Sequence, residues 1–389
     1  MMRRVFLKQT AASAAALIAG PALDAKEAIP VKVRLKCADG RMTWGDQPDT
    51  VARKALLAIN DVEGAYTIPY IQSSPELPIE IAFTDGRVAT CDAALLRDTK
   101  QVGMCTLSPS VTRGTLTNVA PGEYMIEVKA RDAKGAVIAA DLYGPIGVGA
   151  VMAAIGDSIT EGYYGHGFRA DVTHLTAASF PPEAVSKDGR NFPQFAPTTA
   201  SHLPEVNCFE SWMTRLNDEL TAVWKHPVFI ANEGWGGIAS GEYLGRIRGD
   251  TNWAERIRFL RPNLWLIHLG VNDERAHVPR ETFASNMQQI VQALQKDYGA
   301  VPARIFVAKP CFDYFEGAEP ILAAYCEEID KLVTRMKLGA GADFFAGYAK
   351  DRARWYGEDP VHPNVEGMNR MADLWRDTLV RALPSGLRE

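Results

Sequence analysis

The sequence predicts an α/β fold, a three-layer αβα sandwich around a parallel sheet, preceded by a small all-β sandwich or jelly-roll domain. Two observations lead to this prediction. From Val148 onward, continuous apolar runs of strand length alternate with segments of helical periodicity. Before Val148, short segments alternate apolar and polar residues between turns that contain Gly and Asp. We therefore expect the β domain over residues 27–147 and the α/β domain over residues 148–385.

In the first region, the alternation of apolar and polar side chains is that of half-buried strands. The expected strands are residues 31–37, 79–83, 124–130 and 136–138, and turn signals follow at 84–86 and 132–135. No residue pattern in this region indicates chemistry, so the functional site is expected in the second.

In the second region, runs that are apolar on both faces fit the central strands of a covered parallel sheet. These runs are residues 151–155, 228–231, 264–267, 305–308 and, less cleanly, 344–347. The helical patterns between them are 212–223, 282–295 and 321–336. In an open parallel sheet the site lies beyond the carboxyl ends of the strands, so the residues that follow these runs are the ones to inspect.

Composition narrows the class of protein further. The 389 residues are 47% apolar and 23% charged, as in ordinary globular proteins, and are enough for two domains. A formal net charge of −5 gives no support for nucleic-acid binding. The most apolar stretch, residues 11–19, is shorter than a membrane span, so we expect no stable membrane insertion.

The first 25 residues resemble a twin-arginine export signal. Arg3 and Arg4 precede Phe6-Leu7-Lys8 and an Ala-rich segment, and cleavage near Ala22 or Ala25 would remove them. The alternative is a frayed basic N-terminus. The resemblance implies a periplasmic or secreted protein that folds before export.

The six cysteines would then meet an oxidising compartment, where fifteen complete pairings are open. Cys91 and Cys105 are the pair that neighbouring strands could bridge. Neither Cys-x-x-Cys nor His-Glu-x-x-His occurs, so no metal and no cofactor are expected.

Polar segments follow three of the apolar runs, and a further one lies near the C-terminus. They are residues 156–160 (GDSIT), 232–237 (NEGWGG), 270–273 (GVND) and 359–363 (DPVHP). A serine hydroxyl needs a base to become a nucleophile, and the tetrahedral intermediate of acyl transfer needs preplaced donors for its oxyanion. Together the segments offer a serine, a His with a nearby carboxylate, and candidate donors.

Their order and chemistry resemble the SGNH, or GDSL-type, hydrolases over about residues 148–383. The resemblance implies that Ser158 is the nucleophile, that His362 is its base and that Asp359 orients the imidazole. It implies an oxyanion hole made by the amide of Ser158, an amide at Gly237 and the side chain of Asn272. The first of these roles competes with an ordinary helix N-cap at Ser158.

Other features of the segments leave alternatives open. Gly234 and Gly236 compete with Gly237 as the backbone donor. The nucleophile-elbow pattern Gly-x-Ser-x-Gly of the α/β-hydrolases does not occur in the sequence, which disfavours that fold.

The substrate is indicated by aromatic residues near these segments, since sugar rings stack on aromatic faces. Tyr163, Tyr164, Trp235 and Trp355 are the candidates for substrate binding. The layout also resembles bacterial carbohydrate esterases with a β-sandwich before the hydrolase domain. We therefore expect an exported esterase that removes O-acetyl groups from an acetylated poly- or oligosaccharide through an acyl-serine intermediate.

Alternatives use the same scaffold: a lysophospholipase or thioesterase, an O-acetyltransferase, or a glycan-binding protein. A long excursion over residues 163–209, with His166, His174 and His202, is either a lid over the site or an insertion packed on the β domain. The glycan, the acyl position and the oligomeric state are not encoded in any recognisable pattern.

Overall fold

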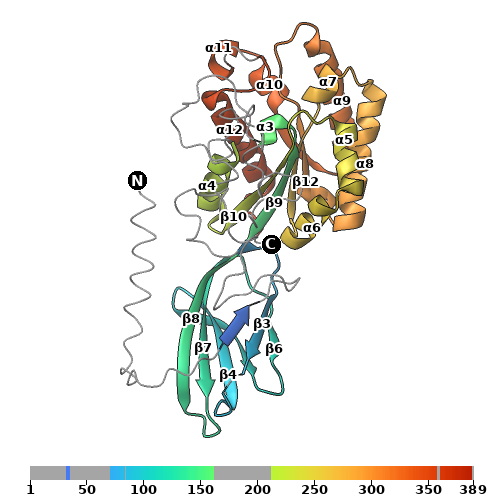
Figure 1. Cartoon of the computed structure of the whole chain (residues 1–389). Helices are drawn as coiled ribbons and strands as arrows, with labels where there is room; N and C mark the ends of the chain where they lie inside the picture. Colours follow the sequence, from blue (N-terminus) through green and yellow to red (C-terminus); the bar gives the residue numbers. More distant parts are fainter. Residues whose placement is uncertain (1–31, 36–70, 84, 162–211, 357–359, 388–389) are drawn as a thin grey trace, which may run out of the picture.

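The computed structural model describes residues 32–35, 71–83, 85–161, 212–356 and 360–387 (Figure 1). Its strands and helices form a β domain followed by an α/β domain, and the chain passes from the first to the second without a linker. No helix within these ranges is long and apolar enough to cross a membrane.

The β domain contains two sheets. An antiparallel sheet has the order β1-β3-β6, with β1 (Lys32–Leu35), β3 (Leu77–Ala82) and β6 (Arg113–Leu116). The other has the order β2-β8-β7-β4-β5, with β2 (Ile71–Gln72), β8 (Val137–Val148), β7 (Gly122–Arg131), β4 (Thr90–Arg97) and β5 (Lys100–Leu107). Alternate side chains of β3, β4 and β7 are buried in one shared core, so the two sheets pack face to face as a sandwich.

The expected strands are found in this domain: 31–37 and 79–83 correspond to β1 and β3, and 124–130 lies within β7. The segment 136–138 is only the start of the much longer β8. Cys91 and Cys105, the pair that neighbouring strands could have bridged, are both free thiols. Cys91 lies opposite Leu107 and Cys105 opposite Ala93, so the two thiols occupy diagonal rather than facing positions of the β4–β5 ladder.

The α/β domain has a five-stranded parallel sheet in the order β10-β9-β11-β12-β13. The strands are β9 (Ala150–Gly156), β10 (Val228–Gly234), β11 (Leu264–His268), β12 (Ile305–Lys309) and β13 (Gly339–Asp343). The helices are α3 (Ser158–Glu161), α4 (Trp212–Trp224), α5 (Ser240–Gly249), α6 (Thr251–Leu260), α7 (Val271–Arg275), α8 (Arg280–Tyr298), α9 (Ala318–Met336), α10 (Phe344–Tyr348), α11 (Arg352–Trp355) and α12 (Val365–Ala382).

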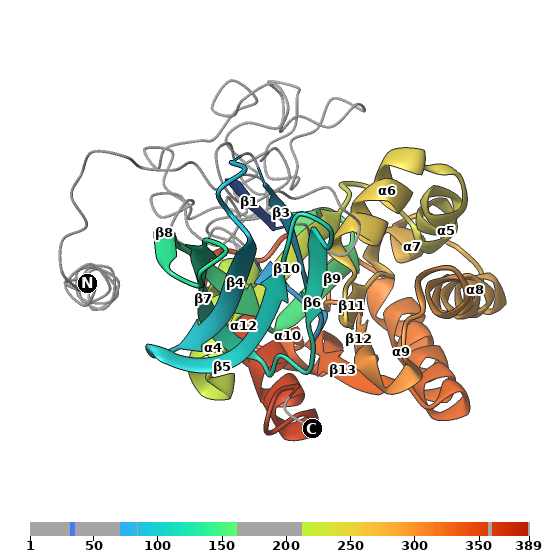
Figure 2. The same ribbon diagram turned by 90° about the horizontal axis from the view of Figure 1, so that it is seen from below.

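Helices cover both faces of this sheet. Every side chain of strand β9 is therefore buried, which is why its sequence is apolar throughout. Met152 and Ala154 are buried with α4 and α12 on one face, whereas Ala153 and Ile155 are buried with α5, α6, α8 and α9 on the other. Figure 2 shows the two groups of helices on opposite sides of the strands. The predicted three-layer sandwich is confirmed.

The prediction of a strand at residues 344–347 is wrong. The strand is β13, just before it, and Phe344–Tyr348 forms helix α10. The carboxylate of Asp343 accepts a hydrogen bond from the amide of Ala346 at 2.9 Å and so starts the helix. Phe344 and Tyr348, one helical turn apart, are both buried. Strand β13 lacks apolar bulk because the Phe306 ring of β12 covers Gly339.

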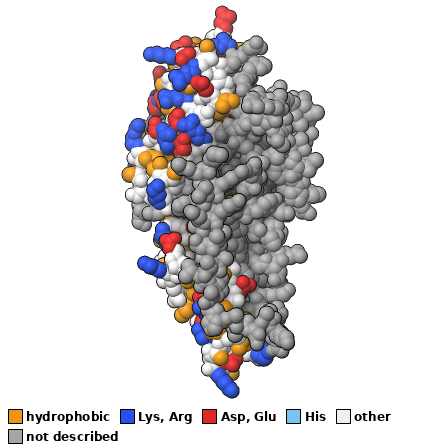
Figure 3. Space-filling view, turned by 90° about the vertical axis from the view of Figure 1, so that its left-hand side faces the viewer, with side chains coloured by type: hydrophobic (Ala, Val, Ile, Leu, Met, Phe, Trp, Pro, Cys, Tyr) orange, Lys and Arg blue, Asp and Glu red, His pale blue; other side chains and the backbone are white. Residues whose placement is uncertain are grey.

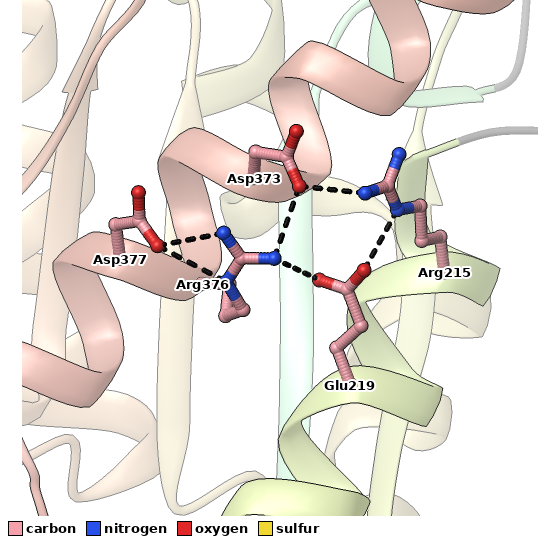
Figure 4. Close-up of polar contacts among 5 residues, drawn as sticks. All are labelled: Arg215, Glu219, Asp373, Arg376 and Asp377. Carbon is pink, nitrogen blue, oxygen red and sulfur yellow. Dashed lines mark hydrogen bonds and ion pairs between the residues drawn. The ribbon is translucent and has the colours of Figure 1, made fainter.

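The helices α4 and α12 are joined at the surface by a cluster of ion pairs (Figure 4). Arg215 pairs with Glu219 and Asp373 at 2.7 Å each, and Arg376 pairs with Glu219 and Asp373 at 3.0 Å each. The face in Figure 3 likewise carries side chains of both signs, intermixed over the described α/β part. Exposed pairs of this kind contribute little to stability, so the apolar core carries the packing of these two helices.

The chain passes from the β domain to the α/β domain through a single residue, Gly149, between β8 and β9. A Cβ atom on Gly149 would lie 2.0 Å from the carbonyl oxygen of Pro227, so only glycine fits. The side chain of Asn263 accepts from the amide of Val151 at 3.0 Å and donates to the carbonyl of Gly149 at 3.1 Å. Together with the buried core that both domains share, these contacts fix the β domain against the amino ends of β9 and β10.

Replacing Gly149 therefore tests the junction. Gly149→Ala should lower the free energy of unfolding by about 2 kcal/mol or more, because the methyl group overlaps the Pro227 carbonyl. Gly245→Ala is the matched control: it lies in α5 with nothing within 4 Å of the new Cβ and should stabilise by about 0.5–1 kcal/mol. Urea unfolding midpoints measure both, and equal effects in the two variants would contradict the tight junction.

Candidate active site

Three adjacent strands end at the same level, and the predicted site residues follow these ends. In the parallel ladders, Gly156 at the end of β9 lies opposite Gly234 of β10 and opposite His268 of β11. The segments with Ser158, Gly237 and Asn272 therefore start from neighbouring points on the carboxyl edge of the sheet. Strand β9 lies between β10 and β11, so the segments with the predicted oxyanion donors start on either side of the segment with the predicted nucleophile.

Ser158 is placed by a tight turn between β9 and α3. A Cβ on Gly156 would lie 2.0 Å from Thr160 Oγ1 and 2.8 Å from the carbonyl oxygen of His268, so the turn requires glycine. The carboxylate of Asp157 accepts from the amide of Ile159 at 3.0 Å and caps the start of α3. Ser158 is thus the first residue of a helix capped by its neighbour, not a capping residue itself.

The hydroxyl of Ser158 and the imidazole of His362 are in hydrogen-bond contact. Ser158 Oγ lies 2.9 Å from His362 Nε2, across 204 positions of sequence. This is the geometry in which a neutral imidazole accepts the serine proton. Ser158 is 9% exposed, so only a small part of this residue reaches the surface. The predicted pair of nucleophile and base is brought together, whereas Asp359 lies outside the described residues.

The segment that carries His362 is held by hydrogen bonds on both sides. The carbonyl of Pro360 accepts from the amide of Tyr314 at 3.1 Å, and the amide of Asn364 donates to the carbonyl of Trp355 at 2.8 Å. Asn364 also caps α12 by accepting from the amide of Gly367 at 3.0 Å. These contacts fix the position of the imidazole relative to Ser158.

The segment after β10, which carries Gly237, is a turn that is hydrogen-bonded to the turn before Ser158. The amide of Trp235 donates to the carbonyl of Gly156 at 3.0 Å, and the amide of Ile238 donates back to Trp235 at 3.3 Å. Gly237, inside this turn, has φ of +75°, which favours glycine. Gly237 is exposed, as a donor toward an arriving substrate would be.

Asn272 lies at the start of α7, after β11. Its Nδ2 donates to the carbonyl oxygen of Ile238 at 3.2 Å. An amide nitrogen carries two hydrogens, so this contact uses one and leaves a second N–H for a ligand. The structure thus places the Gly237 and Asn272 segments in direct contact.

Asp157 is a residue of the site that the sequence analysis missed; its position directly before the predicted nucleophile was the available signal. It is 1% exposed, and burial raises its pKa to about 7, against the opposing effects of the Ile159 amide and of His362. His268 is also buried beneath the site, where burial lowers its pKa to about 3. His268 is therefore neutral, and its Nε2 accepts from the amide of Cys311 at 3.2 Å.

The aromatic candidates divide into two groups. Tyr163, Tyr164 and the excursion 163–209 lie outside the described residues. Trp235 is half-buried, with the guanidinium of Arg246 3.4 Å from its ring centroid. Trp355 is half-buried and packs edge-on against Tyr348. Both tryptophans therefore have structural contacts as well as positions in the segments that carry Gly237 and lead to His362.

The titration of Asp157 gives a pH-dependent stability. Its folded pKa of about 7 exceeds its unfolded value of 3.8, so the native state holds a proton that the unfolded chain releases between these values. This stabilising contribution is complete below pH 3.8 and is lost as the pH rises through 7. Between pH 5 and pH 8 the free energy of unfolding of the wild type should fall by about 2–3 kcal/mol relative to that of Asp157→Asn, whose side chain stays neutral.

Urea unfolding at the two pH values measures this difference. Asp132→Asn, at a turn of the β domain, controls for the removal of one carboxylate. Parallel pH profiles for the wild type and Asp157→Asn would contradict the raised pKa.

The sequence model of the GDSL-like lipase/acylhydrolase family matches residues 154–370. No curated protein sequence matches the chain. Within the described residues, no three His, Cys, Asp or Glu side chains are grouped as metal ligands would be.

Several solved structures are similar to this chain at low sequence identity. The lipase/acylhydrolase from Enterococcus faecalis is 14% identical with a TM-score of 0.39, over 59% of this chain and 95% of that one. A variant of an acetyl xylan esterase from Geobacillus stearothermophilus is 17% identical with a TM-score of 0.40, over 60% and 95%. A Bacillus subtilis protein is 13% identical with a TM-score of 0.38, over 80% and 82%.

The family model spans more than half of the chain and includes the segments of Ser158, Gly237, Asn272 and His362. The chain belongs to the GDSL-like lipase/acylhydrolase family.

Proposed function

We propose that this protein is an exported serine esterase that removes O-acetyl groups from a carbohydrate through an acyl-Ser158 intermediate. The observation that carries the esterase chemistry is the 2.9 Å contact between Ser158 Oγ and His362 Nε2. The segments with Gly237 and Asn272 start beside the Ser158 turn, and we propose that they supply the two further oxyanion donors.

Acylation follows from this arrangement. His362 Nε2 takes the proton of Ser158 as Oγ forms a bond to the acetyl carbonyl carbon. The carbonyl oxygen becomes an oxyanion and accepts hydrogen bonds from the amides of Ser158 and Gly237 and from Asn272 Nδ2. The bond from carbon to the sugar oxygen then breaks, and the protonated His362 returns its proton to that oxygen.

Deacylation repeats the sequence with water. His362 removes a proton from a water molecule, whose oxygen attacks the acyl-Ser158 carbonyl. The second tetrahedral intermediate collapses, acetate leaves, and Ser158 recovers its proton. An acyltransferase would differ only in using a glycan hydroxyl instead of water, so the identity of the acceptor has to be measured.

The carbohydrate part of the proposal is supported by the aromatic residues of the two flanking segments. Trp235 follows β10, in the segment of Gly237, and Trp355 precedes the segment of His362. The guanidinium of Arg246 lies 3.4 Å from the centroid of the Trp235 ring and limits the rotation of this side chain. The proposal rests on the general tendency of sugars to stack their C–H faces on aromatic rings. Export is proposed from the N-terminal Arg3-Arg4 segment alone, and cell fractionation would test it.

Removing the proposed nucleophile or base should abolish activity. Ser158→Ala and His362→Ala should each lower kcat for p-nitrophenyl acetate by about a thousandfold or more. Asn272→Ala should lower kcat by about a hundred- to a thousandfold, because one oxyanion donor is lost. Ser285→Ala, on the exposed side of α8, is the control. Near-normal turnover in Ser158→Ala or His362→Ala would refute the serine mechanism.

The acyl group and the alcohol are tested separately. Turnover of p-nitrophenyl esters should fall beyond acetyl or propionyl, and acetate should be released from at least one acetylated polysaccharide. Ser158→Ala is the control for non-enzymatic hydrolysis. Activity that rises with chain length would indicate a lysophospholipase or thioesterase instead. Acyl transfer to a glycan without hydrolysis would indicate the transferase.

A further inference from the structure

We propose that Asp273, acting through Ser240, is a positioning residue that sets the spacing between the two oxyanion segments. This inference rests on the proposed esterase function, because it assigns the support of the same oxyanion hole. Asp273 follows Asn272 directly, and Ser240 comes three residues after Gly237. A contact between Asp273 and Ser240 therefore joins the two donor segments at a short distance from both donors.

Asp273 is fully buried, and both of its carboxylate oxygens accept hydrogen bonds from one residue, Ser240. Its Oδ2 accepts from the amide of Ser240 at 2.9 Å, and its Oδ1 accepts from Ser240 Oγ at 2.5 Å. Both residues are 0% exposed. A carboxylate in such a place is costly unless its hydrogen bonds are made. Two hydrogen bonds to a single residue define one orientation, whereas either alone would allow rotation.

The serine is itself fixed from a third element. Asn286 of α8 donates from Nδ2 to Ser240 Oγ at 3.0 Å. Since that oxygen accepts from Asn286, its own hydrogen is available for Asp273 alone. Ser240 is also the first residue of α5, whose free amides and helix dipole favour a negative charge at this end. Asp273 thus caps α5 from outside the helix.

A second contact completes the connection. Asn272 Nδ2 donates to the carbonyl of Ile238, between Gly237 and Ser240. The two segments are therefore joined through Asn272 and Asp273 on one side and through Ile238 and Ser240 on the other. An oxyanion hole is effective when its donors are in place before the charge develops, so a connection of this kind affects the transition state more than substrate binding.

Asp273→Asn tests the inference, because an amide keeps the size but offers one acceptor where the carboxylate offers two. If its NH₂ group faced the Ser240 amide, two donors would oppose each other; if it faced the Ser240 hydroxyl, that oxygen would accept from both this group and Asn286, and its own hydrogen would lose the carboxylate acceptor. We expect kcat for p-nitrophenyl acetate to fall about ten- to a hundredfold, with KM within about threefold of the wild-type value. Ser240→Ala, which keeps the amide contact, should fall less.

The probe that isolates the oxyanion hole is an alkyl fluorophosphonate. Ser158 Oγ bonds to phosphorus, fluoride leaves, His362 takes the serine proton, and the phosphoryl oxygen occupies the oxyanion position. The labelling rate of Asp273→Asn should fall by about the same factor as kcat. The double variant with Ser240→Ala should be no slower than Asp273→Asn alone, because both act through one contact.

Asp132→Asn is the matched control: this carboxylate accepts two backbone hydrogen bonds at a turn of the β domain. It should label at the wild-type rate. Labelling and kcat at wild-type values in Asp273→Asn, with only thermal stability lowered, would overturn the inference and leave Asp273 a structural cap. If Asp273→Asn does not fold, the labelling rate and kcat of Ser240→Ala are measured instead, and wild-type values of both would likewise overturn the inference. A wild-type chain that fluorophosphonate does not label would instead overturn the proposed function.

Discussion

The site depends on the common level at which β9, β10 and β11 end. Because Gly156 lies opposite both Gly234 and His268, the three following segments leave the sheet side by side. The close approach at Gly156 then turns the chain into α3 and places Ser158 at the start of that helix. A shift of one residue in either ladder would reverse the faces of the strand and separate nucleophile from donors.

Buried carboxylates support this edge from below. Asp157 caps α3 under the nucleophile, and Asp273 caps α5 under the oxyanion segments. Burial raises the pKa of both groups, while backbone amides at helix starts oppose that rise. Burying these carboxyl groups lowers the free energy of unfolding. Such a loss of stability is common at a preorganised site, in which donors are held in position before substrate arrives.

Features of the fold and the site that depend on local sequence could be predicted, whereas those that depend on contacts between distant residues could not. Covered parallel strands show themselves in continuous apolar runs, and Ser158, Asn272 and His362 stand at the ends of recognisable segments. Strand β13 was missed because small residues under Phe306 carry no apolar signal. The helix α12 was missed although Asn364 and the buried positions Met368, Met371 and Trp375 follow a capped helical pattern.

The contact between Asp273 and Ser240 could not be predicted in this way, since the two residues are 33 positions apart and an Asn-Asp pair is ordinary in turns. Likewise, Gly237 was one of three candidate glycines in its segment. Its positive φ, the turn from Trp235 to Ile238 and the contact of Asn272 with Ile238 are properties of the fold that no local sequence pattern records.

The place of the β domain limits what its described part can do for catalysis. Strand β8 continues into β9 through Gly149, so this domain packs at the amino ends of the strands, whereas Ser158 lies beyond their carboxyl ends (Figure 1). Seven residues of β9 separate the two levels, which corresponds to roughly 20 Å of extended chain. The described β domain therefore cannot contact an acyl group at Ser158. It packs instead against β9 and β10, the strands that precede Ser158 and Gly237.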